Sequence, residues 1–167
     1  MKHLFNPSAE FVHYVSLVRN KYPKLRIETK SHYWYWRALH WLVKIVTFGK
    51  NNTFLEGFAT TIGWKIGVPS DYAHWEPGVK QELLTHEVVH IEQQLRCGFG
   101  QMWLGAPIFA FLYLLFPVPI FFAYFRYISE REAYFASVRF LYEVRGRSRA
   151  AQMEDFFIEA LSGSQYL

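Results

Sequence analysis

The order of the expected elements predicts a single α+β domain that spans residues 1–167. One helix comes first, short strands follow, and helices fill the second half of the chain. A length of 167 residues suits one domain with a real core and is short for two. Hydrophobic residues make up 51% of the chain and aromatic residues 20%, which argues against disorder and indicates much apolar surface to bury.

The first half of the chain predicts two helices and one strand. The first helix is capped by Asn6 or Ser8 and ends near Pro23. The segment KLRIETK alternates well enough for a short strand. The aromatic segment SHYWYWRALHWLVKIVTFGKNN then predicts an amphipathic or largely buried helix, which is capped by Ser31 and stops at Gly49.

The remaining segments predict a hairpin followed by helices. The segment TFLEGFATTIGWKIGVPS predicts two strands or a hairpin that ends at Pro69, and DYAHWEPG predicts a turn-rich loop. A helix is expected from about residue 78 to 96. Further helices are expected over about 126–146 and 150–161.

The helix over 78–96 contains the motif LLTHEVVHIEQQ, with two histidines four residues apart. Residues at this spacing share a helix face, about 5–6 Å apart between Cβ atoms, so His86 and His90 are suited to hold one zinc ion. Glu87 follows the first histidine and is the expected general base and proton shuttle. The alternative is an ordinary helix that happens to carry two histidines.

A catalytic zinc site usually has three protein ligands and one open position for water. No histidine follows His90, so the third ligand is expected among the downstream acids. Glu92 stands two residues from His90 and faces away from it. Glu130 and Glu132 lie together in the next predicted helix, within SEREAYFAS.

Three segments of the chain resemble the minimal gluzincins, which are small thermolysin-like HExxH zinc metallopeptidase domains of phage and bacterial type. TTIGWKIGVP, LLTHEVVHIEQQ and SEREAYFAS are similar, in order, to the edge strand, motif helix and glutamate helix of that family. The resemblance covers roughly residues 53–139. It implies a zincin-like fold, with a small sheet or hairpin packed on the HExxH helix and on a following glutamate-bearing helix.

The same resemblance implies Glu130 as the third ligand, with Glu132 as the alternative. Ala133 then takes the place of the family's small packing residue. Tyr134 stands where the family commonly has an acid that orients a zinc histidine, which is a departure from the pattern.

The function implied is metal-assisted hydrolysis of a peptide bond in a peptide or protein substrate. Zinc lowers the pKa of its water and polarises the scissile carbonyl, and Glu87 carries the proton to the leaving amine. An edge strand over 60–68 would pair with an extended peptide. The expected donors to the oxyanion are His74, Tyr127 and Tyr134, although His74 also fits an ordinary loop histidine.

The segment from Cys97 to Phe125 has no charged residue and is longer than the roughly 20 apolar residues of a spanning helix. Prolines, the first of them Pro107, divide it into shorter pieces. A single crossing would also place Glu130 across the bilayer from the histidines. We therefore expect an apolar helix–turn–helix excursion at about 101–128 that shields the site, forms a homo-oligomer contact or touches a membrane surface.

The remaining features limit which cellular compartment and which binding partners are expected. A net charge of +4 is only mildly basic, no nucleic-acid pattern is present, and the single cysteine, Cys97, forms no internal disulfide. The first residues do not form a secretion signal, so a cytoplasmic protein, peripherally membrane-associated through 101–128, is expected. Two other functions fit the sequence: a non-catalytic, zinc-stabilised binding or membrane-associated module with a degenerate peptidase fold, and a small hydrophobic membrane protein whose HExxH is accidental.

Overall fold

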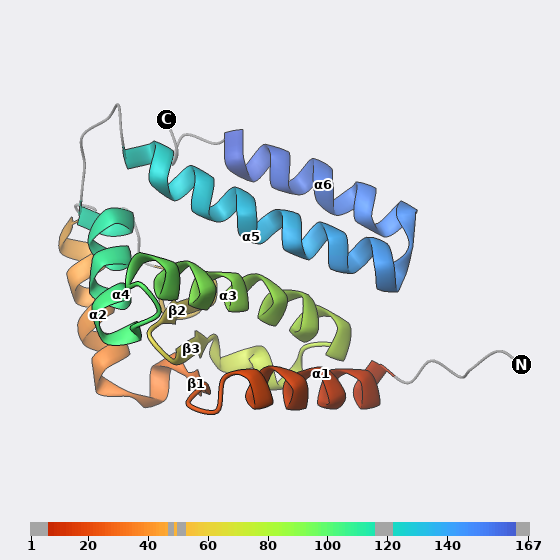
Figure 1. The fold of residues 1–167 in the computed structure, drawn as a ribbon, viewed down its shortest axis with the longest axis horizontal. Helices are drawn as coiled ribbons and strands as arrows, with labels where there is room; N and C mark the ends of the chain where they lie inside the picture. The colour runs from red at the N-terminus through yellow and green to blue at the C-terminus, as the bar shows by residue number, and fades with distance from the viewer. Residues whose placement is uncertain (1–6, 47–48, 50–52, 116–121, 163–167) are drawn as a thin grey trace, which may run out of the picture. The chain divides into compact units, whose positions relative to one another are not determined.

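The computed structural model describes residues 7–46, 49, 53–115 and 122–162, and it confirms the α+β class (Figure 1). Helices dominate, and one small sheet of three strands accompanies them. The chain forms two compact units, Met1–Gln81 and Glu82–Leu167. The assignment of both to a single domain stays a prediction.

Unit 1 begins with helix α1, Pro7–Lys21, which ends just before Pro23 as predicted. Ser8 lies inside its first turn, so the prediction that Ser8 caps this helix is wrong, and the alternative cap Asn6 lies outside the described residues. Pro7 stands at the first helical position, where its fixed φ and missing N–H cost nothing.

Helix α2, Trp34–Val46, starts three residues later than the predicted cap at Ser31. Ser31 is instead the middle residue of a short 3₁₀ helix, η1, Lys30–His32, and Tyr33 returns the chain to an extended conformation before α2 begins. At the other end Gly49 has φ of 79° and donates its N–H to the carbonyl of Lys44. This left-handed residue after the helix agrees with the predicted stop.

The sheet consists of β1, Arg26–Thr29, β2, Thr60–Ile62, and β3, Lys65–Val68, in the order β1-β3-β2. β2 and β3 form the predicted antiparallel hairpin, and Gly63 takes φ of 57° at its turn. β1 pairs with β3 in parallel. Because β3 is central, only β2 satisfies the prediction of an edge strand over 60–68.

The core of unit 1 is formed by α2 and the turn before β2. Trp36, Val43 and Phe54 are buried together. Lys30 is fully buried as well, and its ammonium donates to the carbonyls of Phe54 at 2.5 Å and Phe58 at 2.6 Å. After β3 the chain forms a 3₁₀ helix, η2, Ser70–His74, where a turn-rich loop was predicted.

Helix α3, Pro77–Cys97, starts at the end of unit 1 and continues into unit 2, close to the predicted bounds. The other elements of unit 2 are α4, Met102–Ala110, a π-helix η3, Phe111–Leu115, and two long helices, α5, Phe122–Arg145, and α6, Arg147–Ser162. α5 and α6 pack along each other as a helical hairpin, joined at Gly146 with φ of 83° (Figure 1).

Two glycines bring α4 against the C-terminal half of α3. A Cβ atom on Gly105 would overlap the backbone carbonyl of Gln94, and one on Gly98 would overlap the backbone at Gly105. Only glycine permits this approach. α4 also passes through Pro107, so the prediction that this proline divides the apolar segment is wrong; its ring is accommodated inside a helix of nine residues.

The described part of the apolar segment is therefore a helix that continues as a π-helix, followed by the start of α5. The turn expected between its two helices falls at 116–121, outside the described residues. Within the parts of the chain that the structure describes, no helix has both the length and the apolar character needed to span a bilayer.

Candidate metal centre

His86 and His90 on α3 meet Glu130 on α5, inside unit 2. The two Nε2 atoms lie 3.1 Å apart. Oxygens of the Glu130 carboxylate lie 3.2 Å from Nε2 of His86 and 3.8 Å from Nε2 of His90. All three side chains are largely buried, and their ligand atoms lie within 4.8 Å of one another.

These separations match the requirements of a small tetrahedral cation. Ligands about 2.0–2.1 Å from a tetrahedral zinc ion are about 3.3–3.4 Å from one another. The two Nε2 atoms are 3.1 Å apart, and a different Glu130 oxygen faces each histidine, Oε2 at 3.2 Å from His86 and Oε1 at 3.8 Å from His90, so the separations lie near that value. Two imidazoles and one carboxylate also form a donor set that zinc accepts, with one coordination position left over. The residues therefore fit a zinc ion.

Gln93 determines which nitrogen of His90 faces the centre. The amide Nε2 of Gln93 donates to the carbonyl of Ser129 at 2.9 Å and to the carboxylate of Glu132 at 3.0 Å, and both partners only accept. The amide oxygen must then face Nδ1 of His90, which lies 2.8 Å away. Nδ1 is therefore the protonated nitrogen, and the lone pair is on Nε2, the atom that faces His86 within the cluster.

Glu132, the alternative third ligand, lies on the far side of Gln93 from the histidines. Its carboxylate forms an ion pair with Arg96, with Nη2 2.6 Å from both oxygens. It also accepts the hydrogen bond from Gln93. The structure thus brings Glu130 to the imidazoles and places Glu132 in a network that joins α3 to α5.

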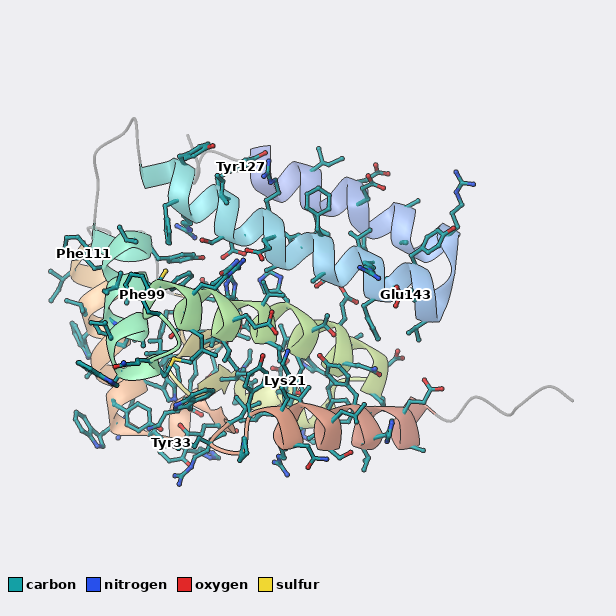
Figure 2. The ribbon with its side chains drawn as sticks, viewed as in Figure 1. Lys21, Tyr33, Phe99, Phe111, Tyr127 and Glu143 are labelled. Atoms are coloured by element: carbon teal, nitrogen blue, oxygen red, sulfur yellow. The ribbon has the colours of Figure 1, made fainter. Side chains whose placement is uncertain are left out.

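The apolar segment contributes a polar group to this centre. The hydroxyl of Tyr113, in the π-helix, donates to the Glu130 carboxylate. Phe109 of α4 lies against the ring of His90, with centroids 6.1 Å apart. Figure 2 labels Phe111, where this π-helix begins, and Tyr127 on α5. Single π-helical turns inside helices are rare and are frequent at functional sites.

The electrostatics of the cluster favour an ionised carboxylate beside a positive charge. Burial alone would raise the pKa of Glu130, but the hydrogen bond with His86, the charges of both histidines and the Tyr113 hydroxyl hold that pKa at about 2. Burial alone would lower the pKa of His86, yet Glu130, Glu87 and Glu82 raise it above its ordinary value. The carboxylate is therefore ready to bind a cation at neutral pH.

The other predicted site residues lie in different environments. Glu87 is buried, and its negative charge acts on His86. The ring of Tyr134 lies against His86, with centroids 4.8 Å apart, and stacks on Phe157. Tyr127 faces the guanidinium of Arg131. His74 is the exposed last residue of η2 in unit 1, so its role as an oxyanion donor stays a prediction.

Sequence reasoning missed Gln93 and Tyr113. Gln93 stands three residues after His90, a spacing that places both on one helix face, so it was detectable as a partner of the histidine. Tyr113 is a hydroxyl-bearing residue in an almost wholly apolar run. Its partner Glu130 is 17 residues away, and only the folded chain shows that they meet.

Comparison with known proteins overturns the family resemblance. The family model that matches is BatA: Aerotolerance regulator N-terminal, over residues 102–160, which is about a third of the chain. It is not a zincin or peptidase family, so the assignment to the minimal gluzincins is wrong. No curated protein and no solved structure matches the chain.

The error has a physical cause. HExxH and a later glutamate are short patterns dictated by metal chemistry, and such patterns arise on chains with no common origin. The matched segment runs from α4 into α6 and includes Glu130 but neither histidine. The α+β class and the geometry of the cluster do not depend on the resemblance.

Proposed function

We propose that the protein is a zinc-dependent hydrolase that cuts peptide bonds, with His86, His90 and Glu130 as the metal ligands and Glu87 as the general base. The observation that carries this proposal is the convergence of two Nε2 atoms and one carboxylate at separations of 3.1, 3.2 and 3.8 Å. The hydrogen bond to Gln93 supports it, because it presents the lone pair of His90 to the same point.

Zinc in this donor set supplies Lewis acidity, which activates water and polarises a carbonyl group. Glu87 accepts the proton of the attacking water and delivers it to the leaving amine. The negative charge of Glu87 reaches the adjacent imidazole of His86, which supports a place for its carboxylate beside the cluster. Tyr113 holds Glu130 in position through its hydroxyl.

A peptide is the proposed substrate because the chemistry of the cluster suits amide hydrolysis. A bound zinc ion would polarise the amide carbonyl, and the Glu87 carboxylate would move the proton from water to the leaving amine. An unfolded protein exposes many such amide bonds and is therefore the substrate to test first.

The test combines metal analysis with cleavage of an unfolded protein. We expect the purified chain to hold one zinc ion and to cut reduced, unfolded casein. Glu87→Gln should retain the zinc and lose at least about 100-fold in rate, since a positioned base contributes about 10²–10⁴-fold. Glu92→Gln removes an acid five residues along the same helix and should cut like the native chain.

The outcomes separate the alternatives. A chain that holds zinc and cuts no peptide would favour the non-catalytic, zinc-stabilised binding module. A chain that binds no zinc even when it is supplied would overturn both metal-based functions. Equal rates for Glu87→Gln and the native chain would remove Glu87 from the mechanism.

A further inference from the structure

Helix α2 of unit 1 has an outer face of exposed apolar side chains. Trp34 is 72% exposed, Trp41 63% and Ile45 68%. Ala38 and Leu42 are exposed beside them. At about 100° per residue these five side chains occupy an arc of roughly 100° on one side of the helix. Tyr33, labelled in Figure 2, stands directly before them and is 41% exposed.

The opposite side of the same helix forms the core of unit 1. Trp36 and Val43 are buried there, against Phe54. An ordinary surface helix has one apolar stripe toward the core and a polar face toward water. α2 has two apolar stripes, and the outer stripe lies outside the core cluster of unit 1.

The charges beside the outer stripe are all positive. Arg37 and Lys44 lie along one flank of the stripe, within about 60° of Trp41 at the helical period. The chain has no aspartate or glutamate between Glu28 and Glu56, so no acid on this helix opposes them. Lys44 also lies over the ring of Trp41, with Nζ 5.5 Å from its centroid.

We propose that α2 is a membrane-binding helix that lies in the surface of a bilayer containing anionic lipid. Tryptophan prefers the headgroup level of a bilayer, where its ring is buried and its N–H stays hydrated. Ile45 and Leu42 enter the acyl boundary. Arg37 and Lys44 contact lipid phosphates, each with a Coulomb attraction that salt weakens.

A second copy of the chain fits this face less well than a bilayer. Two α2 helices that pack face to face bring together the same basic flanks, with no acid on either helix to neutralise them. An anionic surface neutralises both.

The test is co-sedimentation of the full chain with two kinds of vesicle, one of phosphatidylcholine alone and one of an equal mixture of phosphatidylcholine and phosphatidylglycerol. We expect the native chain to bind the mixed vesicles more tightly, with an affinity that falls as salt rises. The paired variant Trp41→Glu and Ile45→Glu should lose at least about tenfold in partitioning, because it removes two inserted apolar side chains.

A matched control makes the same change elsewhere in unit 1. Val12→Glu and Leu17→Glu replace two exposed apolar residues of α1, which are 66% and 52% exposed, with two carboxylates. This control has the same net charge as the α2 variant, and it should bind the mixed vesicles clearly more tightly than the α2 variant does. Arg37→Gln with Lys44→Gln should reduce binding to the mixed vesicles and remove most of its salt dependence.

Several results would overturn the proposal. One is a native chain that binds neither vesicle, and another is equal loss of binding in the α1 and α2 variants. A third is vesicle binding that the α2 variant keeps and that Phe99→Glu with Trp103→Glu abolishes; both of these side chains are exposed in unit 2. Light scattering that shows a dimer dispersed by the α2 variant, without vesicle binding, would assign the face to a second copy. If the paired α2 variant loses helical circular dichroism, Trp41→Ser alone replaces it.

Discussion

Gln93 offers a sharp test of the proposed metal centre, because its side chain contacts Nδ1 of His90 and not the Nε2 atom proposed to bind the metal. The substitution Gln93→Leu keeps the volume of the side chain and removes its hydrogen bonds. Gln93 is only 5% exposed, so water cannot easily replace those bonds. His90 would lose the acceptor that holds its Nδ1 proton, and its ring would be free to turn.

The structure sets the size of the effect. Gln93 makes three hydrogen bonds, at 2.8 Å to His90, 2.9 Å to Ser129 and 3.0 Å to Glu132. At roughly 1 kcal/mol each, their loss lowers the free energy of unfolding by about 3 kcal/mol. Loss of the partner that orients a metal-binding histidine also weakens metal affinity by roughly 10- to 100-fold.

Gln94→Leu is the matched control. Gln94 is buried as well, and its Nε2 donates to the backbone carbonyl of His90 at 3.2 Å, a bond to the main chain and not to the imidazole. We expect it to lower stability while leaving zinc affinity close to that of the native chain. Urea unfolding of the metal-free proteins measures the first quantity, and competition with a chromogenic chelator measures the second.

Equal zinc affinity in Gln93→Leu and the native chain, together with the expected fall in stability, would refute the reasoning. Gln93 would then join α3 to α5 without any influence on the metal. An equal fall in zinc affinity for Gln93→Leu and Gln94→Leu would also count against a specific role.

The other predictions concern both units. Tyr113→Phe removes the hydroxyl that donates a hydrogen bond to the Glu130 carboxylate. We expect zinc affinity to fall about tenfold, measured by chelator competition, and the helical circular dichroism to stay unchanged. Gly105→Ala places a methyl group on the backbone carbonyl of Gln94, and should lower the free energy of unfolding in urea by roughly 1–3 kcal/mol. The pKa of Glu56 is lowered, chiefly because the hydroxyl and the backbone N–H of Ser70 donate hydrogen bonds to its carboxylate. The ionised carboxylate therefore stabilises the fold at pH values above its ordinary pKa of 4.5, and this stabilisation is lost as the pH falls below that value. Glu56→Gln should therefore melt below the native chain at pH 7, with the gap closing under acid conditions. An unchanged gap would contradict this, as would full zinc affinity in Tyr113→Phe or native stability in Gly105→Ala.

Local pattern predicts much of this fold. Helical spacing identifies α3 and the histidine pair, and the β-branched run around Gly63 identifies the hairpin. Gly49 and Gly146 end helices with positive φ, as glycine after a helix is expected to do. These features depend on interactions between residues that are near in sequence.

Long-range packing decides what the pattern leaves open. Ser31 is a good helix cap by composition, yet the chain forms a 3₁₀ turn there because Lys30 is drawn into the core toward the carbonyls of Phe54 and Phe58. Pro107 stays inside a helix. No local pattern indicates either outcome.

The candidate site divides in the same way. The spacing of the motif predicts that His86 and His90 share a face, but the sequence leaves Glu130 and Glu132 equally near in the next helix. Arg96 and Gln93 engage Glu132, and Tyr113 engages Glu130. Contacts 17 to 39 residues apart along the chain therefore distinguish the two acids.

X-ray absorption at the zinc edge of the 167-residue chain tests the central claim most directly. The geometry predicts one zinc ion with nitrogen and oxygen neighbours at about 2.0–2.1 Å, outer-shell scattering from two imidazoles, and loss of the ion or its geometry in Glu130→Gln but not in Glu132→Gln. A sulfur neighbour at about 2.3 Å, which would point to Cys97, would contradict the assignment. So would a zinc spectrum that Glu130→Gln leaves unchanged.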